Sequence, residues 1–300
     1  MNGFETFDAI EVPAENAVIF LRRGGDGPPL LLLHGFPQTH LMWRQMAPLL
    51  ARHFTVVCAD LRGYGRSGCP PTRPDHAPYS KRTMAGEMCA VMNKLGFARF
   101  CVAGHDRGGR VAYRLALDRP DAVERLAVLD VLTIADAWEN ADKKLATGFW
   151  PWSLLAQDCP LPERLIAAAP EAIVDNALGG WGSAAATFDD EVRAAYIEAL
   201  RDPAHIHAIC EEYRAAATID HEHDIKDRHT GRRITCPVLA LWSSRGPLNN
   251  WYADIGGPLM LWKDWATNVQ GKPVDGGHFF PEEFPAQTAE TLIGFFADKR

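Results

Sequence analysis

The sequence predicts an α/β protein: a mostly parallel central sheet with helices on both faces and an inserted helical cap. Two observations indicate this class. Short apolar runs alternate with helix-like segments in the first and last parts of the chain. Between them, from about 135 to 232, strand-like runs disappear and alanine becomes frequent. We therefore expect a core made of 1–134 and 233–300, with the cap at 135–232. With 300 residues, 47% of them hydrophobic, the chain can bury a large core.

The expected strands are short runs that either alternate in polarity or are apolar throughout. They comprise a hairpin within 4–23 and strands at 29–33, 54–59, 100–103, 123–130, 236–242 and 270–274. The expected core helices cover 41–50, 83–95, 106–117 and 285–296, and the expected cap helices cover 137–147, 162–169, 189–201 and 206–217. Helices that connect successive strands in this way favour a parallel sheet.

The strand at 100–103 leads into the sequence Gly104-His105-Asp106-Arg107-Gly108. This G-x-D-x-G turn matches the nucleophile elbow, with aspartate in the place where ester hydrolases carry serine. The turn is tight, so small residues are needed at Gly104 and Gly108. The pKa of a free aspartate is roughly 3.9, so Asp106 is expected to be an anion that attacks a saturated carbon and forms an ester. The alternative is an ordinary Asp-Gly turn without chemistry.

Water must cleave such an ester, and this step needs a base. His278 follows two glycines near the end of the chain, where hydrolases with an elbow nucleophile place their base. The loop after the strand at 236–242 has no acid before Asp254, so Asp130 is expected to orient the imidazole instead. The alternative for Asp130 is a cap of the following helix. All these residues follow strands, at the edge where open α/β sheets bind ligands.

Two further features concern charge in the expected site. The backbone N–H groups of Phe36 and Arg107 are expected to form an oxyanion hole for the intermediate of ester hydrolysis. Arg107 and Arg110 lie about one helical turn apart, and a guanidinium binds a carboxylate through two hydrogen bonds. Two such groups beside an anionic nucleophile indicate a negatively charged substrate. The alternative is that both arginines form surface ion pairs.

Taken together, these motifs resemble the fluoroacetate (haloacetate) dehalogenases of the α/β-hydrolase superfamily over nearly the whole chain. The matching segments are 34–37, 104–110, 129–130, 152–157, 212–215 and 276–279. The resemblance implies that Asp106 attacks the carbon bearing the halogen and that Asp130 and His278 activate water. It also implies that Arg107 and Arg110 hold the substrate carboxylate, that Trp152 and Tyr213 contact the departing halide, and that the protein is a homodimer.

One position departs from the family pattern. Family members that handle fluoride well have His-Trp where this chain has Pro151-Trp152. Proline supplies no hydrogen-bond donor, and the loss of one donor costs about 2–4 kcal/mol of transition-state stabilisation. We therefore expect hydrolytic dehalogenation of a small 2-halocarboxylic acid, with weak activity on the carbon–fluorine bond.

Two other functions remain open on the sequence alone. An epoxide hydrolase shares the Asp-His-Asp machinery, and Tyr213 could protonate an epoxide oxygen. Relatives with neutral substrates look to have tryptophan where this chain has Arg107. The arginine therefore favours a halocarboxylic acid over an epoxide as the substrate. The second alternative is a catalytically silent fold that binds a small acid or a partner protein.

The composition restricts the partners and the compartment. A net charge of -7 and a pI near 5.9 argue against binding to nucleic acid or to an anionic membrane surface. No apolar stretch has the length of a membrane span, and the start of the chain has no signal-peptide pattern. Seven cysteines without a C-x-x-C motif indicate a reducing compartment. We expect a cytoplasmic protein without a metal or cofactor, whose ligand is a small anionic haloacid.

Overall fold

The computed structural model describes residues 3–298, and these residues contain an eight-stranded sheet with the order β1-β2-β4-β3-β5-β6-β7-β8. The strands are β1 (Asp8–Pro13), β2 (Val18–Gly24), β3 (Pro29–Leu33), β4 (Thr55–Ala59), β5 (Phe100–His105), β6 (Val123–Leu129), β7 (Val238–Ser243) and β8 (Val269–Val274). β2 pairs antiparallel with β1 and β4, and the pairs from β4 to β8 are parallel. The predicted mostly parallel α/β fold is confirmed.

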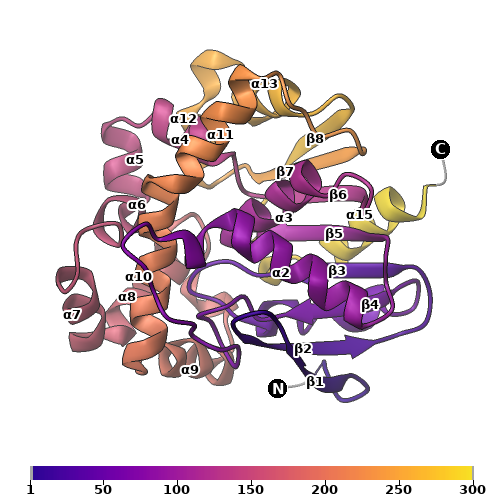
Figure 1. The fold of residues 1–300 in the computed structure, drawn as a ribbon, viewed down its shortest axis with the longest axis horizontal. Helices are drawn as coiled ribbons and strands as arrows, with labels where there is room; N and C mark the ends of the chain where they lie inside the picture. Colours follow the sequence, from indigo (N-terminus) through magenta and orange to yellow (C-terminus); the bar gives the residue numbers. More distant parts are fainter. Residues whose placement is uncertain (1–2, 299–300) are drawn as a thin grey trace.

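The sheet is covered on both faces, and β3 shows how. Leu31 and Leu33 belong to the cluster that contains the apolar side of α2 (Lys81–Lys94) and α3 (Asp106–Asp118). Leu30 and Leu32 point to the other face, where α1 (Ala47–Leu50) and α15 (Pro285–Ala297) pack. Successive side chains of a strand alternate between faces, so a strand buried on both sides must be apolar throughout. In Figure 1, α2 and α3 lie in front of the sheet and α15 behind it.

Between β6 and β7 the described chain is helical. It forms α4 (Ile134–Glu139), α5 (Lys143–Gly148), α6 (Trp150–Leu154), α7 (Leu161–Ala168), α8 (Pro170–Gly180), a 3-10 turn (Ala185–Thr187), α9 (Asp190–Ala199), α10 (Pro203–Ala217) and α11 (Ile219–His229). We refer to 134–229 as the helical segment. Figure 1 shows α5 to α10 gathered beside the sheet, past the end at which β5 finishes. This places the helical segment over the carboxyl ends of the strands, where ligands bind in such sheets.

Two expected helices are each divided in the structure. The segment expected at 41–50 forms a 3-10 turn (His40–Trp43) and the short α1, in which Pro48 occupies the first turn. Proline has no N–H to continue a preceding helix, so a new helix begins there. The segment expected at 137–147 forms α4 and α5, because the Asp142 side chain accepts the N–H groups of Lys144 and Leu145 and starts a second helix.

The remaining elements lie around the last two strands and before α2. They are the 3-10 turn Ala77–Tyr79, α12 (Pro247–Trp251), the 3-10 turn Ala253–Ile255, α13 (Gly257–Trp265) and α14 (Phe280–Glu283). Of these, α12 and α13 lie between β7 and β8, and the sequence analysis anticipated neither. No helix within 3–298 has the length and apolarity needed to cross a bilayer.

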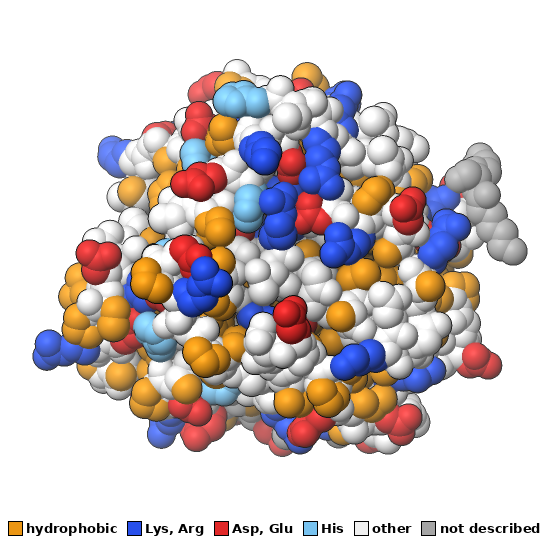
Figure 2. All heavy atoms as spheres, viewed as in Figure 1, with side chains coloured by type: hydrophobic (Ala, Val, Ile, Leu, Met, Phe, Trp, Pro, Cys, Tyr) orange, Lys and Arg blue, Asp and Glu red, His pale blue; other side chains and the backbone are white. Residues whose placement is uncertain are grey.

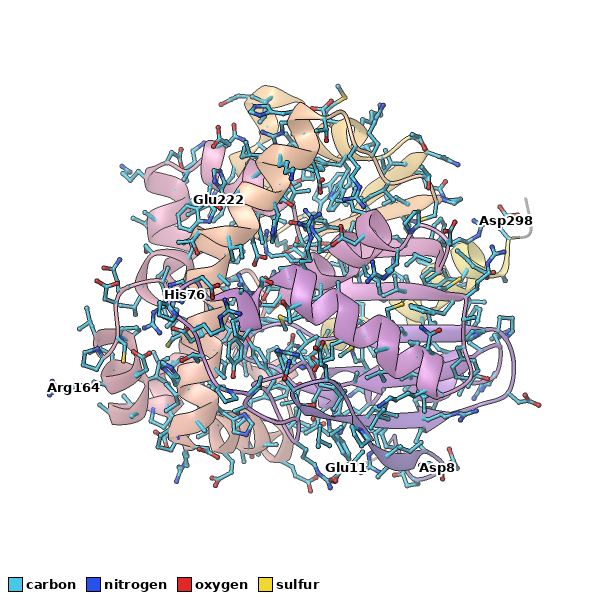
Figure 3. All side chains as sticks on the ribbon, in the orientation of Figure 1. Asp8, Glu11, His76, Arg164, Glu222 and Asp298 are labelled. Carbon is cyan, nitrogen blue, oxygen red and sulfur yellow. The ribbon has the colours of Figure 1, made fainter. Side chains whose placement is uncertain are left out.

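Polar contacts attach the helical segment to the core. His76 Nδ1 lies 2.9 Å from Glu211 Oε2 of α10, and Figure 3 labels His76 beside that helix. Tyr113 of α3 donates a 2.7 Å hydrogen bond to Asp224 Oδ2 of α11. These contacts to α10 and α11 fix the two helices over the elbow. On the face of the molecule drawn in Figure 2, charged and hydrophobic side chains are interspersed.

Candidate active site

Asp106 occupies a strained turn between β5 and α3. Its φ is 45°, in the left-handed region that side chains other than glycine rarely adopt. A Cβ atom on Gly104 would lie 2.3 Å from the Gly108 carbonyl oxygen, and one on Gly108 would lie 2.3 Å from the His34 carbonyl oxygen. The small residues expected at 104 and 108 are therefore required by the close approach of strand and helix.

The carboxylate of Asp106 is buried and charged. Its Oδ2 accepts a 3.1 Å hydrogen bond from the backbone N–H of Phe36, one of the two donors expected for the oxyanion hole. Burial alone would raise the pKa of Asp106, but the charges of His278, Arg107, His105 and Arg110 hold this pKa below its ordinary value. Asp106 is thus an anion at neutral pH without the help of a base.

His278 and Asp130 form a buried pair. Nδ1 of His278 lies 2.5 Å from Oδ2 of Asp130, and Oδ1 of Asp130 accepts a 2.7 Å hydrogen bond from the Ser243 N–H at the end of β7. The last residue of β7 therefore contributes a backbone donor to Asp130. Nε2 of His278 is buried without a hydrogen-bond partner in the described chain. Edge contacts with Phe149 and Trp181, at 5.5 and 5.3 Å between ring centroids, hold the imidazole ring.

The Arg107 guanidinium is fully buried against α10. Its Nε donates a 2.8 Å hydrogen bond to Glu212 Oε1, and its Nη2 donates a 3.2 Å hydrogen bond to the Glu212 carbonyl oxygen. The guanidinium carbon lies 3.9 Å from the ring centroid of Tyr213. Nη1 is buried and has no partner in the described chain. Arg107 is therefore in an internal ion pair, not the surface pair considered from the sequence.

Arg110 is buried without a carboxylate partner. Its Nη1 donates a 2.6 Å hydrogen bond to the Leu132 carbonyl oxygen, and its guanidinium carbon lies 4.3 Å from the ring centroid of Trp152. Nε has no partner, and within residues 3–298 no ion pair involving Arg110 is formed. Burial and the neighbouring Arg107 lower the pKa of Arg110. An unpaired cation in this position favours an anionic ligand.

A cavity of about 20 Å³ adjoins the nucleophile. It is lined by Asp106, Arg110, Asp130, Leu132, Ala137, Leu145, Phe149, Trp152, Leu248, Trp251 and Tyr252. Ligand cavities for drug-sized molecules have roughly 300–1,000 Å³, so this space is far too small for a ligand of that size. Phe36, Arg107, Tyr213 and His278 are not among the lining residues. Tyr213 packs with its ring edge on Phe36, at 5.9 Å between centroids.

One cluster in the described chain combines metal-ligand types. The side chains of Cys159, Glu163 and His207 approach within 4.8 Å of one another in the helical segment. Glu163 Oε1 already lies 3.0 Å from His207 Nδ1 and 2.8 Å from Arg214 Nη2. The guanidinium of Arg214 compensates the carboxylate charge that a metal ion would need, so this cluster is an ion-pair network.

The family model described as "alpha/beta hydrolase fold" matches residues 28–285. The chain belongs to this family. The match covers the elbow, the helical segment and the loop that carries His278, and strand, sharp turn and helix at Asp106 are the features expected of a hydrolase elbow.

Two relatives of this α/β hydrolase are named after different activities, dehalogenation and epoxide hydrolysis. A protein from Burkholderia sp named fluoroacetate dehalogenase is 44% identical over 298 residues, covering 99% of this chain and 96% of that protein. A soluble epoxide hydrolase from Corynebacterium sp. (strain C12) is 32% identical over 289 residues, covering 92% of each. The crystal structure of ALR0039 from Nostoc sp PCC 7120 has a TM-score of 0.92 at 46% identity, covering 98% of this chain and 99% of that one. The resemblance to fluoroacetate dehalogenases inferred from the motifs is confirmed.

In this α/β hydrolase, the sequence analysis assigned no role to Glu212, although 212–215 was among the matching segments, and it did not consider Tyr252. Glu212 lies on α10, directly before Tyr213, and is completely buried. The charged residues Glu211 and Arg214 lie beside it in the sequence, so nothing local marked Glu212 as the acid paired with Arg107. Tyr252 follows α12 in a segment for which no element was expected, so its place in the cavity could not be inferred.

Proposed function

We propose that this protein hydrolyses the carbon–halogen bond of a small 2-halocarboxylic acid. The observation that carries the proposal is the unpaired, buried guanidinium of Arg110 in the same cavity as the ionised Asp106. The unpartnered Nη1 of Arg107 adds a second donor near the nucleophile. A carboxylate bound by these donors neutralises the buried positive charge and holds the adjacent carbon for attack.

In the first step, Asp106 displaces the halide. Oδ2 accepts the Phe36 N–H, so Oδ1 is the oxygen assigned to attack the carbon. A carbon–oxygen bond forms as the carbon–halogen bond breaks, and the halide leaves with the bonding electron pair. The product is an ester of Asp106 in which Oδ2 is the carbonyl oxygen.

In the second step, water cleaves this ester. Nε2 of His278 is unpartnered and takes the proton from water, while Asp130 stabilises the resulting imidazolium through Nδ1. The hydroxide adds to the ester carbon, and the backbone N–H groups of Phe36 and Arg107 stabilise the negative charge on Oδ2. Collapse breaks the bond to the alcohol oxygen, which takes the proton from the His278 imidazolium and leaves as the 2-hydroxy acid. The Asp106 carboxyl loses the remaining proton of the added hydroxide to solvent, which restores the carboxylate.

The departing halide needs hydrogen-bond donors in this buried cavity. Trp152 lines the cavity and is assigned to the halide, together with Tyr213. Pro151 is buried at the start of α6 and has no donor to add. Fluoride depends most on such donors, so weak defluorination remains part of the proposal.

Epoxide hydrolysis is the alternative, because the same carboxylate opens an epoxide and a relative at 32% identity carries that name. A neutral epoxide leaves Arg110 without a counter-ion, which favours the haloacid. The experiment compares chloroacetate, chloroacetamide and styrene oxide as substrates. We expect chloride release from chloroacetate, little release from the neutral amide, and no turnover of the epoxide. Turnover of the epoxide alone would replace this proposal by the alternative.

Two variants test the assigned roles. We expect Asp106→Asn to release no halide from chloroacetate. We expect His278→Asn to accumulate an ester on Asp106, seen as a mass increase of the intact protein. Halide release by a protein that never carries the ester would contradict the two-step route, and a silent binding protein would show neither effect.

We also propose a homodimer in a reducing, cytoplasmic compartment. All seven cysteines are free, which supports the compartment, and the resemblance to the dehalogenase family supports the dimer. Sedimentation equilibrium measures the oligomeric state directly.

A further inference from the structure

We infer that Glu212 is a positioning residue that holds the Arg107 guanidinium away from the nucleophile and directs it at the substrate carboxylate. This inference rests on the proposed function, because it concerns how the substrate is held. Glu212 comes from α10 of the helical segment, and Arg107 comes from the elbow. The interaction therefore couples the position of α10 to the chemistry of Asp106.

The geometry around Arg107 is asymmetric. Glu212 accepts hydrogen bonds from two of its nitrogens. Nε donates to the Glu212 carboxylate at 2.8 Å, and Nη2 donates to the Glu212 backbone carbonyl at 3.2 Å. A guanidinium has five N–H donors in a rigid plane, so these two contacts fix the whole group. Nη1 is left buried and unpartnered. This nitrogen is left for a bound carboxylate, and the guanidinium carbon lies 5.6 Å from the ring centroid of Trp152, which lines the cavity beside Asp106.

Arg107 directly follows Asp106, yet no ion pair within 4 Å joins the two side chains in the part of the chain that the structure describes. Without a competing carboxylate, the oppositely charged neighbours would pair inside this buried site. Such a pair would cover the attacking oxygen and occupy the donor meant for the substrate. Glu212 prevents this by binding the guanidinium on its far side.

Glu212 is itself fixed by the core. Lys81 Nζ lies 2.5 Å from Glu212 Oε1, and Tyr64 donates a 2.7 Å hydrogen bond to Glu212 Oε2. Both carboxylate oxygens are thus engaged, and Glu212 is completely buried. A carboxylate held at both oxygens keeps one orientation, which is the property a positioning residue requires.

The two chemical steps separate positioning from a purely structural role. Ester formation needs the substrate carboxylate to be held by Arg107 and needs Asp106 to be free. Ester hydrolysis depends on His278, Asp130 and backbone donors. A positioning role therefore predicts a selective loss in the first step, whereas partial unfolding lowers the amount of active protein and leaves both rate constants unchanged.

The experiment measures the burst of chloride release from chloroacetate and the steady rate that follows, in the wild type and in Glu212→Gln. We expect the rate constant of ester formation to fall at least about tenfold and that of ester hydrolysis to stay within about twofold. In the single variant Lys81 keeps one carboxylate partner, Asp220 Oδ2 at 3.7 Å. The double variant Lys81→Met/Glu212→Gln removes the charges of both Lys81 and Glu212, so it tests the same loss without the buried ammonium. Unchanged ester formation in both variants would overturn the inference.

A matched control is Glu87→Gln, which breaks another buried pair. Arg62 donates to Glu87 at 2.9 and 2.6 Å, away from the cavity, so we expect lower stability but unchanged rate constants. A wild type that releases no halide would defeat the proposed function. The inference about Glu212 is then still decided by calorimetry with acetate, which lacks a leaving group. Glu212→Gln should bind acetate at least about tenfold more weakly, and equal binding would refute the positioning role.

Discussion

Asp130 Oδ2 lies 2.5 Å from Nδ1 of His278, while Nε2 of the same ring is buried without a partner in the described chain. The carboxylate therefore fixes the tautomer with its proton on Nδ1 and leaves the lone pair on Nε2 for the proton of water. The Asp130 backbone has a φ of 49°, a conformation that needs support from its surroundings. The Ser243 N–H bond to Oδ1 supplies part of that support.

Replacing Asp130 by asparagine should slow the second step selectively. The amide removes the charge that stabilises the imidazolium, so we expect ester hydrolysis to fall by about 10³–10⁴-fold, as for the loss of a triad carboxylate. Ester formation needs no base and should change by less than about threefold. Rapid quenching and intact-protein mass spectrometry should therefore show Asp106 alkylated throughout the reaction. An equal loss in both steps would show that Asp130 acts on the fold rather than on His278.

The halide pocket gives a second prediction, at Pro151. Wild-type protein should release fluoride from fluoroacetate at least about tenfold more slowly than chloride from chloroacetate, because one donor is missing. Pro151→His should raise the kcat/KM for fluoroacetate, divided by the kcat/KM for chloroacetate, by about tenfold or more. Pro203→His is the control, since Pro203 begins α10 in an exposed position and its replacement should leave the ratio unchanged. Faster wild-type turnover of fluoroacetate than of chloroacetate would refute the role assigned to Pro151.

Two glycines test the packing of the elbow. A Cβ at Gly108 would lie 2.3 Å from the backbone oxygen of His34, so Gly108→Ala must move the strand or the helix and should destabilise the fold by about 3 kcal/mol or more. In α2, a Cβ at Gly86 meets nothing within 4 Å. Gly86→Ala should therefore stabilise the protein by about 0.5–1 kcal/mol through helix propensity. Urea unfolding measures both, and equal effects would contradict the packing argument.

The sequence was most informative where one local rule determined the structure. The run 29–33 is apolar at every position, so it could only be a strand covered on both faces, and β3 has those bounds. The elbow was recognisable because a tight turn needs glycine at fixed offsets around Asp106. Sequence rules failed at α13, where Gly256 and Gly257 precede an apolar stretch that lacks a usual N-terminal capping side chain. Tertiary packing of Trp262 and Trp265 holds that helix.

The positions of site residues could be predicted from the sequence only where one secondary-structure element determines them. Asp106 and His278 each follow a strand, so their edge of the sheet could be inferred from order along the chain. The Arg107–Glu212 pair joins positions separated by 105 residues, and no local pattern encodes it. This separation along the chain explains why the sequence analysis assigned Arg107 to the substrate carboxylate and gave it no internal partner. In the structure, Glu212 takes two of its donors and leaves Nη1.

The pH dependence of the free energy of unfolding should reveal how much the charge of Glu212 stabilises the fold. Burial would raise the pKa of Glu212, but Arg107 and Lys81 lower it from 4.5 to about 2. A depressed pKa stabilises the fold above the unfolded-state pKa, and this contribution is lost as the pH falls towards the folded-state pKa. The wild type should exceed Glu212→Gln by about 3 kcal/mol at pH 7, and this difference should shrink by about 1 kcal/mol by pH 3.5.

Urea unfolding of both proteins from pH 8 to pH 3.5 measures this difference. The control is Asp175→Asn, which removes an exposed carboxylate held by Arg193 at 2.5 and 2.6 Å on the surface. Solvent screens that pair, so its loss should change stability little at any pH and even less in high salt. A difference between wild type and Glu212→Gln that stays constant down to pH 3.5 would mean that Glu212 contributes through packing and hydrogen bonds instead of through its charge.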